Sequence, residues 1–280
     1  MPQISKILFP VDFSESCLGA ARYVEAFAGR FESEIMLLHT VAAGERTLPE
    51  ELLPLRKRKL DAFLADELKY FTTHRVCEIA DDAAAAIVDE ARSWEADLVV
   101  MPTHGLGFFR RHLLGSVTAK ALHDLDCPLW TSVHAEVAPP LEEIHCRRIL
   151  CATALDPCSH KVLQWANWLA DECGASLGIV YATPEIDRSA ASWNLEEEFN
   201  RQVTAEAAKR IADLQAQAGT HASELMIASG RPEAVVAREA ANFNADLLVI
   251  GRHSGAGIAG HLFQNAYAIL REAPCPVISI

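Results

Sequence analysis

Short runs of consecutive apolar residues alternate along the chain with longer stretches in which apolar residues recur at helical spacing. The short runs predict buried strands, and the longer stretches predict amphipathic helices. In the first half, strands are expected at 4–11, 34–40, 75–79, 97–101 and 128–133, and helices at 14–29, 49–71, 81–94 and 115–125. Strands that alternate with helices in this way are typical of a parallel sheet with both faces covered.

The second half of the chain repeats the first. Arg148-Ile-Leu-Cys-Ala follows Lys6-Ile-Leu-Phe-Pro by 142 residues, and Ala245-Asp-Leu-Leu-Val-Ile follows Ala96-Asp-Leu-Val-Val-Met by 149 residues. Strands are therefore expected near 148–153, 177–182, 222–228, 246–251 and 276–280, and helices near 158–173, 193–218, 231–243 and 262–272. The repeat predicts two domains, 1–138 and 146–280. The segment from His134 to Cys146, which contains two adjacent prolines, is expected to link them.

Composition narrows the class of protein. The chain has 280 residues, of which 50% are hydrophobic, so it is long enough for two apolar cores. Its net charge of −13 argues against a general nucleic-acid binder, whose affinity depends on neutralising phosphates. The eight cysteines lack the C-x-x-C spacing of zinc or redox sites, and no apolar run reaches the length of a membrane span. No metal site, no membrane and a cytoplasmic location are expected.

The strand at 97–101 leads into a loop suited to an anion. Gly105 and Gly107 allow the backbone to approach a ligand closely, and Gly115-Ser116 open the next helix. Backbone N–H groups at a helix N-terminus favour a phosphate, and the aligned peptide dipoles add positive potential. Arg110 and Arg111 lie between the glycines; phosphate contact and an ordinary solvated face are about equally favoured for them.

The same stretch resembles a known family. Pro102-Thr-His-Gly105, nine further residues, Gly115-Ser116 and then Cys127-Pro128-Leu129 is similar to the Gly-x-x-Gly-x9-Gly-Ser/Thr pattern of universal stress proteins. Pro102 departs from the pattern because it replaces the first glycine and has no N–H to donate. The resemblance implies two tandem doubly wound α/β domains, each with a five-stranded parallel sheet in the order 3-2-1-4-5 flanked by helices. Their ligands would bind where the strand order reverses.

The resemblance also implies a binding site for ATP, or for ADP or AMP, with Mg²⁺ as an optional companion. Asp12 would accept a hydrogen bond from a base amino group or a sugar hydroxyl. Other residues would flank the base or hold the phosphates, and these are Thr40, Met101, Gly105, Gly115, Ser116 and Val117. The alternatives are a turn or helix cap for Asp12, a strand end for Thr40, and core packing for Met101 and Val117. His104 is interpreted as a loop histidine, and no catalytic residue is assigned.

The second half is expected to keep the fold and to have lost this site. Ala154 stands where Asp12 does in the first half, and Gln264-Asn265 stand at the place of Gly115-Ser116. The sequence Gly255-Ala-Gly257-Ile-Ala-Gly260 matches a dinucleotide-binding pattern literally. It follows a fourth strand and has no acidic partner about 20 residues later, so a plain glycine loop is favoured.

Three functions remain open on the sequence. The first is a stress-response protein that binds an adenine nucleotide in its N-terminal half and thereby adjusts contacts with an unidentified protein partner. The second is an enzyme, at most a slow ATPase or a self-phosphorylating protein, because no Walker lysine motif is present. The third is a nucleotide-free scaffold. By resemblance, strands 128–133 and 277–280 would pair as an internal pseudo-dimer, in a monomer or a homodimer.

Overall fold

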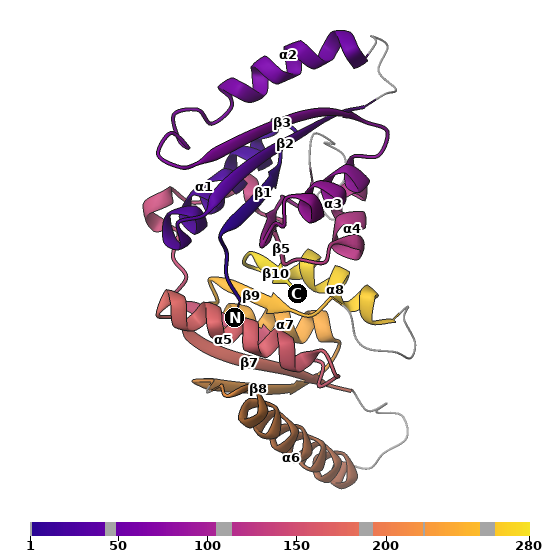
Figure 1. Ribbon diagram of the computed structural model, residues 1–280. Coiled ribbons are helices and arrows are strands. Elements are labelled where there is room, and N and C mark those ends of the chain that lie inside the picture. Colours follow the sequence, from indigo (N-terminus) through magenta and orange to yellow (C-terminus); the bar gives the residue numbers. More distant parts are fainter. Residues whose placement is uncertain (1, 43–48, 105–113, 185–192, 221, 253–260) are drawn as a thin grey trace. The chain divides into compact units, whose positions relative to one another are not determined.

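The computed structural model describes residues 2–42, 49–104, 114–184, 193–220, 222–252 and 261–280. Its contacts divide the chain into two compact units, residues 1–145 and 146–280 (Figure 1). Each unit is an α/β domain and is described by itself. Among the described residues, we find no helix that combines the length and the apolar character needed to cross a membrane.

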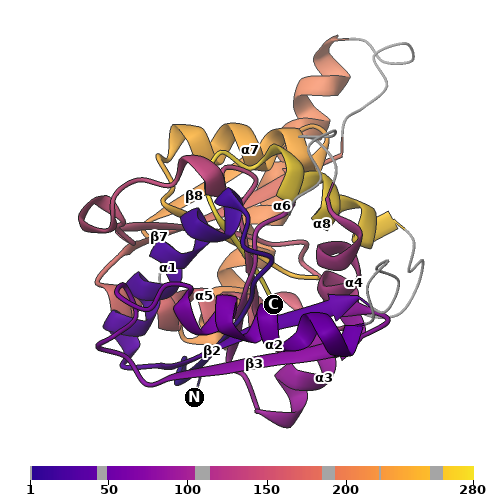
Figure 2. The ribbon, with the colours of Figure 1, turned by 90° about the horizontal axis from the view of Figure 1, so that it is seen from above.

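The first unit contains a five-stranded sheet in the order β3-β2-β1-β4-β5, with every described pair parallel. The strands are β1 (Lys6–Pro10), β2 (Glu34–Ala42), β3 (Thr73–Ala80), β4 (Leu98–Val100) and β5 (Leu129–Thr131). The helices are α1 (Glu15–Phe31), α2 (Pro49–Ala62), α3 (Ala83–Ser93) and α4 (Ser116–Asp124). Helices α3 and α4 pack against each other in both Figure 1 and Figure 2, on the side of the sheet opposite α1.

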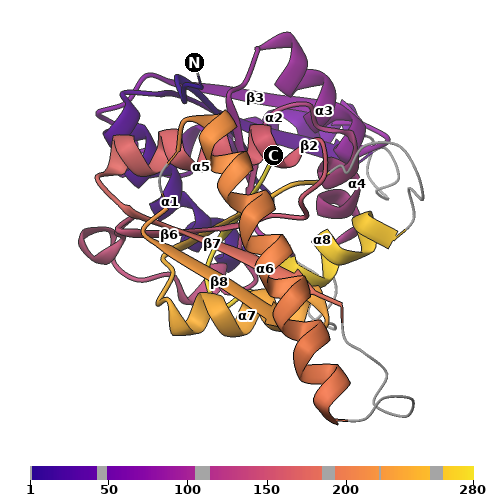
Figure 3. The ribbon, with the colours of Figure 1, turned by 90° about the horizontal axis from the view of Figure 1, so that it is seen from below.

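The second unit repeats this topology in the order β8-β7-β6-β9-β10. Its strands are β6 (Arg148–Ala152), β7 (Ser176–Thr183), β8 (Glu224–Ser229), β9 (Leu247–Ile250) and β10 (Val277–Ser279). Its helices are α5 (Ser159–Cys173), α6 (Trp193–Ala218), α7 (Pro232–Asn242) and α8 (His261–Glu272). Helix α6, in the foreground of Figure 3, runs across β7 and β8. The predicted fold class is confirmed in both units.

Apolar runs form the central strands because both faces of the sheet are covered. Ile7, Leu8 and Phe9 of β1 are completely buried, and so are Ile149 and Leu150 of β6. Burying one such side chain stabilises a fold by about 1.5–3 kcal/mol. The central strands therefore fix the turns that follow them, and those turns carry the polar residues of interest.

One predicted helix is shorter than expected. The stretch 49–71 was predicted to be helical throughout, but α2 ends at Ala62 and Leu64 has a left-handed backbone with φ 54°. Arg75 of β3 donates hydrogen bonds to the carbonyl oxygens of Leu60 (3.1 Å) and Phe63 (3.3 Å). A guanidinium that satisfies the last carbonyls is a favourable helix end, and sequence periodicity does not reveal a partner so far along the chain.

The segment predicted to be a linker is packed on the first unit. Two short 3-10 turns, Ala135–Val137 and Leu141–Glu143, lie against α1. At Gly19, an added Cβ would come within 1.6 Å of the Ala135 carbonyl oxygen, so only glycine allows this approach. The Arg22 guanidinium donates to the carbonyl oxygens of Ala138 and Pro139. This segment therefore belongs to the structure of the first unit.

Candidate functional site

A pocket of about 400 Å³ opens at the carboxyl ends of β1, β2 and β4 in the first unit. This is the point at which the strand order reverses, where ligands of open α/β sheets bind. Its walls come from the turn after β1, the strands β2 and β4, and the first turns of α3 and α4. Lining residues include Pro10, Val11, Asp12, Thr40, Met101 and Gly115.

The turn after β1 holds Asp12 at the wall of the pocket. Phe13 has a left-handed backbone with φ 63°, and Ser14 caps α1 by accepting a hydrogen bond from the Cys17 N–H (3.2 Å). The Asp12 Oδ1 atom accepts hydrogen bonds from the Ser14 N–H and from the Cys17 thiol, both at 3.0 Å. Asp12 therefore does make the turn considered as an alternative, while Ser14 takes the role of helix cap.

His39 of β2 contacts the same turn at Val11 and Phe13. Its Nδ1 atom lies 2.7 Å from the Val11 carbonyl oxygen, so Nδ1 carries the proton as the donor. Its ring packs on Phe13 with a centroid distance of 4.5 Å, and the Phe13 ring also contacts Phe63 at 5.2 Å. Burial lowers the pKa of His39, which favours the neutral ring. This packing holds Phe13 in its left-handed conformation and so fixes the direction of Asp12.

The N-terminus of α4 faces the pocket with its backbone N–H groups. Gly115 is the N-cap, and among the described residues no side chain caps this helix end. The residues after it, Ser116, Val117 and Thr118, also line the pocket. Thr118 is held by a hydrogen bond from its hydroxyl to the Pro102 carbonyl oxygen (3.1 Å). An uncapped helix N-terminus beside a polar pocket is suited to a phosphate or another anion.

Space for an anion at this helix depends on glycine. The Gly115 N–H donates to the Thr103 carbonyl oxygen at 2.8 Å, which brings the two backbones together. A Cβ added at Gly115 would lie 3.2 Å from that oxygen, closer than most side chains tolerate. A side chain here would therefore both strain the loop and project toward the site.

The opposite wall is the start of α3. Asp82 caps this helix by accepting hydrogen bonds from the N–H groups of Ala84 (3.0 Å) and Ala85 (3.1 Å), and it forms an ion pair with Lys120 of α4. The hydrogen bond from Lys120 is the main reason that the pKa of Asp82 is lowered. Ala83 and Ile87 of this helix present apolar surface to the pocket. The site therefore has an apolar wall on one side and a polar helix end on the other.

The structure brings six of the seven predicted site residues to one pocket. These are Asp12, Thr40, Met101, Gly115, Ser116 and Val117. The seventh, Gly105, lies outside the described residues, as do Gly107, Arg110 and Arg111.

Two pocket residues with polar groups were not assigned to the binding site from the sequence: Cys17, and Thr118, which was considered only as a possible site of self-phosphorylation. Thr118 could have been found, because it lies two positions after Ser116 in the first turn of the same helix. Cys17 had no signal of its own beyond its place one turn into α1. Pro102 and His104 also line the pocket, and the His104 Nδ1 atom is 2.7 Å from the Thr103 hydroxyl.

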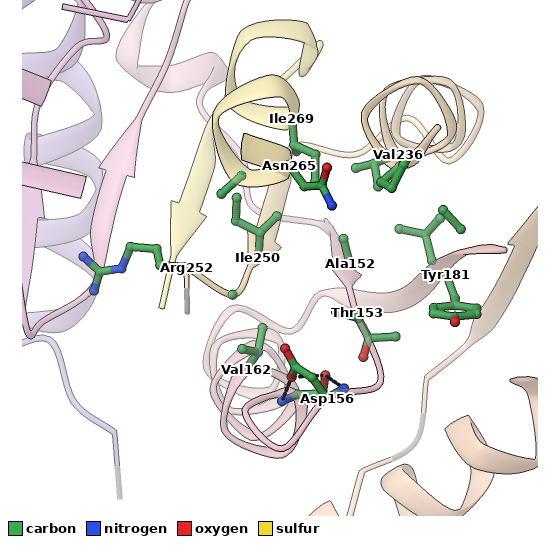
Figure 4. A pocket seen from close by; sticks show the side chains of 17 residues that line it. Ala152, Thr153, Asp156, Val162, Tyr181, Val236, Ile250, Arg252, Asn265 and Ile269 are labelled. Carbon is green, nitrogen blue, oxygen red and sulfur yellow. Dashed lines mark hydrogen bonds between the residues drawn. The ribbon is translucent and has the colours of Figure 1, made fainter. Parts of the chain in front are cut away.

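The second unit has a smaller pocket at the equivalent place, of about 220 Å³ (Figure 4). Ala154 takes the position of Asp12, and the nearest carboxylate is that of Asp156, two residues later. The Asp156 Oδ1 atom accepts hydrogen bonds from the N–H groups of Cys158 (3.0 Å) and Ser159 (2.9 Å) and from the Ser159 hydroxyl (2.9 Å). This carboxylate therefore closes the first turn of α5.

The helices around this second pocket offer few backbone N–H groups to an anion. At the offset of 149 residues that relates Leu98 to Leu247, Ser116 corresponds to Asn265. Helix α8 already begins at His261, so Asn265, Ala266 and Ile269 line the pocket with the side of a helix. Helix α7 begins with Pro232, which has no N–H. The guanidinium of Arg252 points away from the other labelled side chains in Figure 4.

Comparison with known proteins decides the family. A sequence model of the universal stress protein family matches residues 3–132 and again residues 145–280. The chain belongs to the universal stress protein family. Each half of the chain matches the family model once, so this universal stress protein has the tandem two-domain arrangement that the internal repeat predicted.

Several proteins of known sequence or structure are similar to this chain. Universal stress protein A homolog 2 of Coxiella burnetii is 26% identical over 137 residues, which cover 48% of this chain and 94% of that protein. A universal stress protein from Archaeoglobus fulgidus superposes over 99% of this chain and 98% of its own, with a TM-score of 0.72 at 20% identity. A universal stress protein solved in complex with cAMP covers 48% of this chain and 96% of its own, with a TM-score of 0.37 at 20% identity.

Proposed function

We propose that the N-terminal unit binds one adenine nucleotide, ATP or the related ADP or AMP, and that the C-terminal unit does not. One observation carries this proposal: the open N-terminus of α4 and the carboxylate of Asp12 face the same pocket. The first suits a phosphate group, and the second suits a donor on a base or sugar. A volume of about 400 Å³ also falls within the range of sites for small ligands.

In this arrangement, different residues of the pocket contact the base, the sugar and the phosphates of the nucleotide. Asp12 accepts a hydrogen bond from the amino group of the base or from a sugar hydroxyl. Thr40, Met101 and Ile87 flank the base with a mixed apolar surface, and the N–H groups at Ser116 and Val117 hold the phosphates. Mg²⁺, when present, offsets the charge of the phosphates.

Pro102 weakens the site without closing it. Its ring lies in the pocket wall, and its carbonyl oxygen accepts the Thr118 hydroxyl. A single missing N–H donor costs on the order of 1 kcal/mol, which is about 5- to 10-fold in affinity. The site therefore binds more weakly than one with a full set of donors.

Nucleotide occupancy is proposed to act on protein contacts in a stress response. The first turn of α4 lines the pocket, so a partner protein that contacts this helix could distinguish the loaded from the empty state. The cytoplasm, where adenine nucleotides are abundant, is the proposed location.

Calorimetric titration of MgATP into the full chain tests the proposal. Gly115→Arg is expected to weaken binding by about 100-fold or more, because the new side chain fills the phosphate end of the pocket. Asn265→Arg makes the matched change in the second unit and is expected to leave affinity within about twofold. Ala83→Trp, which fills the pocket from the opposite wall, replaces Gly115→Arg if that variant unfolds. Unchanged binding in both pocket-filling variants would overturn the assignment.

A further inference from the structure

Cys17 and Asp12 are joined by two hydrogen bonds inside the N-terminal pocket. The Cys17 thiol donates to the Asp12 Oδ1 atom with an S···O distance of 3.0 Å, and the Asp12 backbone N–H donates to the sulfur at 3.5 Å. Cys17 lies on the first turn of α1, is only 2% exposed and lines the pocket. The thiol therefore ties the side chain and the backbone of Asp12 to a rigid helix.

The environment keeps this thiol protonated. Burial is the main cause that raises the pKa of Cys17 to about 12, and the negative charge of Asp12 raises it further. A thiol with so high a pKa has almost no thiolate at neutral pH, and thiolate is the form that reacts with oxidants and electrophiles. Cys17 is therefore suited to donate a hydrogen bond and poorly suited to sense redox conditions.

Two protein donors then act on the same oxygen atom of Asp12. The Ser14 N–H, at 3.0 Å, comes from the turn, and the Cys17 thiol comes from the helix. An ionised carboxylate offers only acceptors, so the group of the ligand that meets it must be an N–H or O–H donor. Donors from two different elements fix the plane of the carboxylate better than the turn alone.

We propose that Cys17 is a positioning residue that orients the Asp12 carboxylate for a hydrogen-bond donor on the nucleotide, either the base amino group or a sugar hydroxyl. This inference rests on the proposed function, because it assigns a role within the same pocket. Cys17 would act on the nucleotide through Asp12 and would make no contact of its own with it. It would therefore control both affinity and the preference for ligands that carry the donor.

The second unit shows what the same position does without the site. Ser159 occupies the position of Cys17, 142 residues later, and its hydroxyl donates to Asp156 at 2.9 Å. There the acceptor, Asp156, belongs to the turn that leads into α5, and Ala154 stands in the place of Asp12. The donor at this position has thus been retained in both halves, but only in the first half does it orient a carboxylate at the end of the central strand.

The test compares Cys17→Ala, which removes the donor, with Cys17→Ser, which keeps one. Cys151→Ala is the matched control, because this thiol is equally buried in the core of the second unit and its pKa is also raised to about 12 by burial. Affinities for ATP, ITP and 2′-deoxyATP are measured by calorimetry, and folding is checked by thermal unfolding. ITP lacks the base amino group, and 2′-deoxyATP lacks a sugar hydroxyl.

Cys17→Ala is expected to bind ATP about 5- to 10-fold more weakly and to lose part of the preference for ATP over ITP or over 2′-deoxyATP. Cys17→Ser and Cys151→Ala are expected to keep both within about twofold. Native protein that binds ATP, with Cys17→Ala unchanged in affinity and preference, would overturn this inference alone. Native protein that binds none of the three nucleotides would overturn the proposed function and this role with it.

Discussion

The two halves of this universal stress protein build the same turn and use it differently. After the central strand, Phe13 in the first half and Leu155 in the second both have left-handed backbones, with φ 63° and 55°. The first half places its carboxylate before this residue, at Asp12, and leaves the helix cap to Ser14. The second half places its carboxylate after it, at Asp156, where it accepts the N–H groups of the turn that leads into α5. The carboxylate thus lies two positions later in the second half, where it stabilises the turn before the helix.

A second difference lies at the helix after the fourth strand. Helix α4 begins at Ser116, so the N–H groups of its first turn lie at the pocket. Helix α8 begins at His261, four residues before the position that corresponds to Ser116, which adds one turn. The N–H of Asn265 is then the fifth of its helix and bonds within it. We therefore expect the earlier start of α8 to make the second pocket less suited to an anion than the first.

Removal of the two carboxylates, one at a time, is expected to affect the two halves in different ways. Asp12→Ala is expected to weaken MgATP binding by about 10- to 100-fold, because a hydrogen bond to a charged group is lost. Asp156→Ala is expected to leave binding unchanged and to lower the free energy of unfolding by about 1 kcal/mol or more, because the hydrogen bonds of the turn before α5 are lost. Calorimetry and urea unfolding on both variants measure the two quantities. Equal effects of both variants on binding would break the comparison.

A backbone N–H donor restored at position 102 should tighten nucleotide binding in the first unit. Pro102→Gly returns a backbone N–H at the position where the family pattern has glycine, and it is expected to tighten MgATP binding by about 5- to 10-fold. Pro102→Ala restores the N–H with less added backbone freedom and serves as a second variant. Affinity measured by calorimetry that stays the same in both variants would show that this position contributes no donor to the ligand.

The stability of the first unit should fall at acidic pH because of His39. Burial lowers the pKa of His39 in the folded state, so the unfolded chain binds a proton that the folded chain does not. The resulting stability is present above the usual histidine pKa of about 6.5 and is lost as pH falls toward the lower folded value. His39→Gln is expected to lose less stability than the native protein between pH 7.5 and pH 5.5, measured by urea unfolding.

His145→Gln provides the control, because it makes the same substitution at an exposed position. Tyr181 takes the position of His39 in the second unit, 142 residues later, so that half has no histidine at this place. An identical pH profile for His39→Gln and the native protein would mean that the turn carrying Asp12 is not coupled to this ring.

The smallest effect is expected from returning an aspartate to the second half. Ala154→Asp restores the side chain that corresponds to Asp12, but the early start of α8 remains. MgATP is therefore expected to bind with unchanged stoichiometry and with an affinity within about twofold of the native value. A second nucleotide bound per chain would show that the carboxylate alone determines which half has a site.

Much of the fold and of the candidate site could be predicted from the sequence, because both depend on local sequence patterns. The apolar runs and the internal repeat predicted both sheets, and the resemblance to universal stress proteins predicted residues that line one pocket. Contacts between distant segments could not be predicted in the same way. The end of α2 depends on Arg75 of a later strand, and the packing of Ala135 on α1 depends on Gly19. The hydrogen bond between Cys17 and Asp12 depends on the direction of a turn that sequence periodicity does not encode.

The number of nucleotides carried by each chain tests the asymmetry between the halves most directly. The freshly purified protein would be denatured, and the released ATP, ADP and AMP would be counted against protein, with saturation by MgATP as the upper limit. The account predicts about one adenine nucleotide per chain at saturation, lost in Gly115→Arg and kept in Asn265→Arg. Two nucleotides per chain, or none together with no thermal shift in millimolar MgATP, would contradict it.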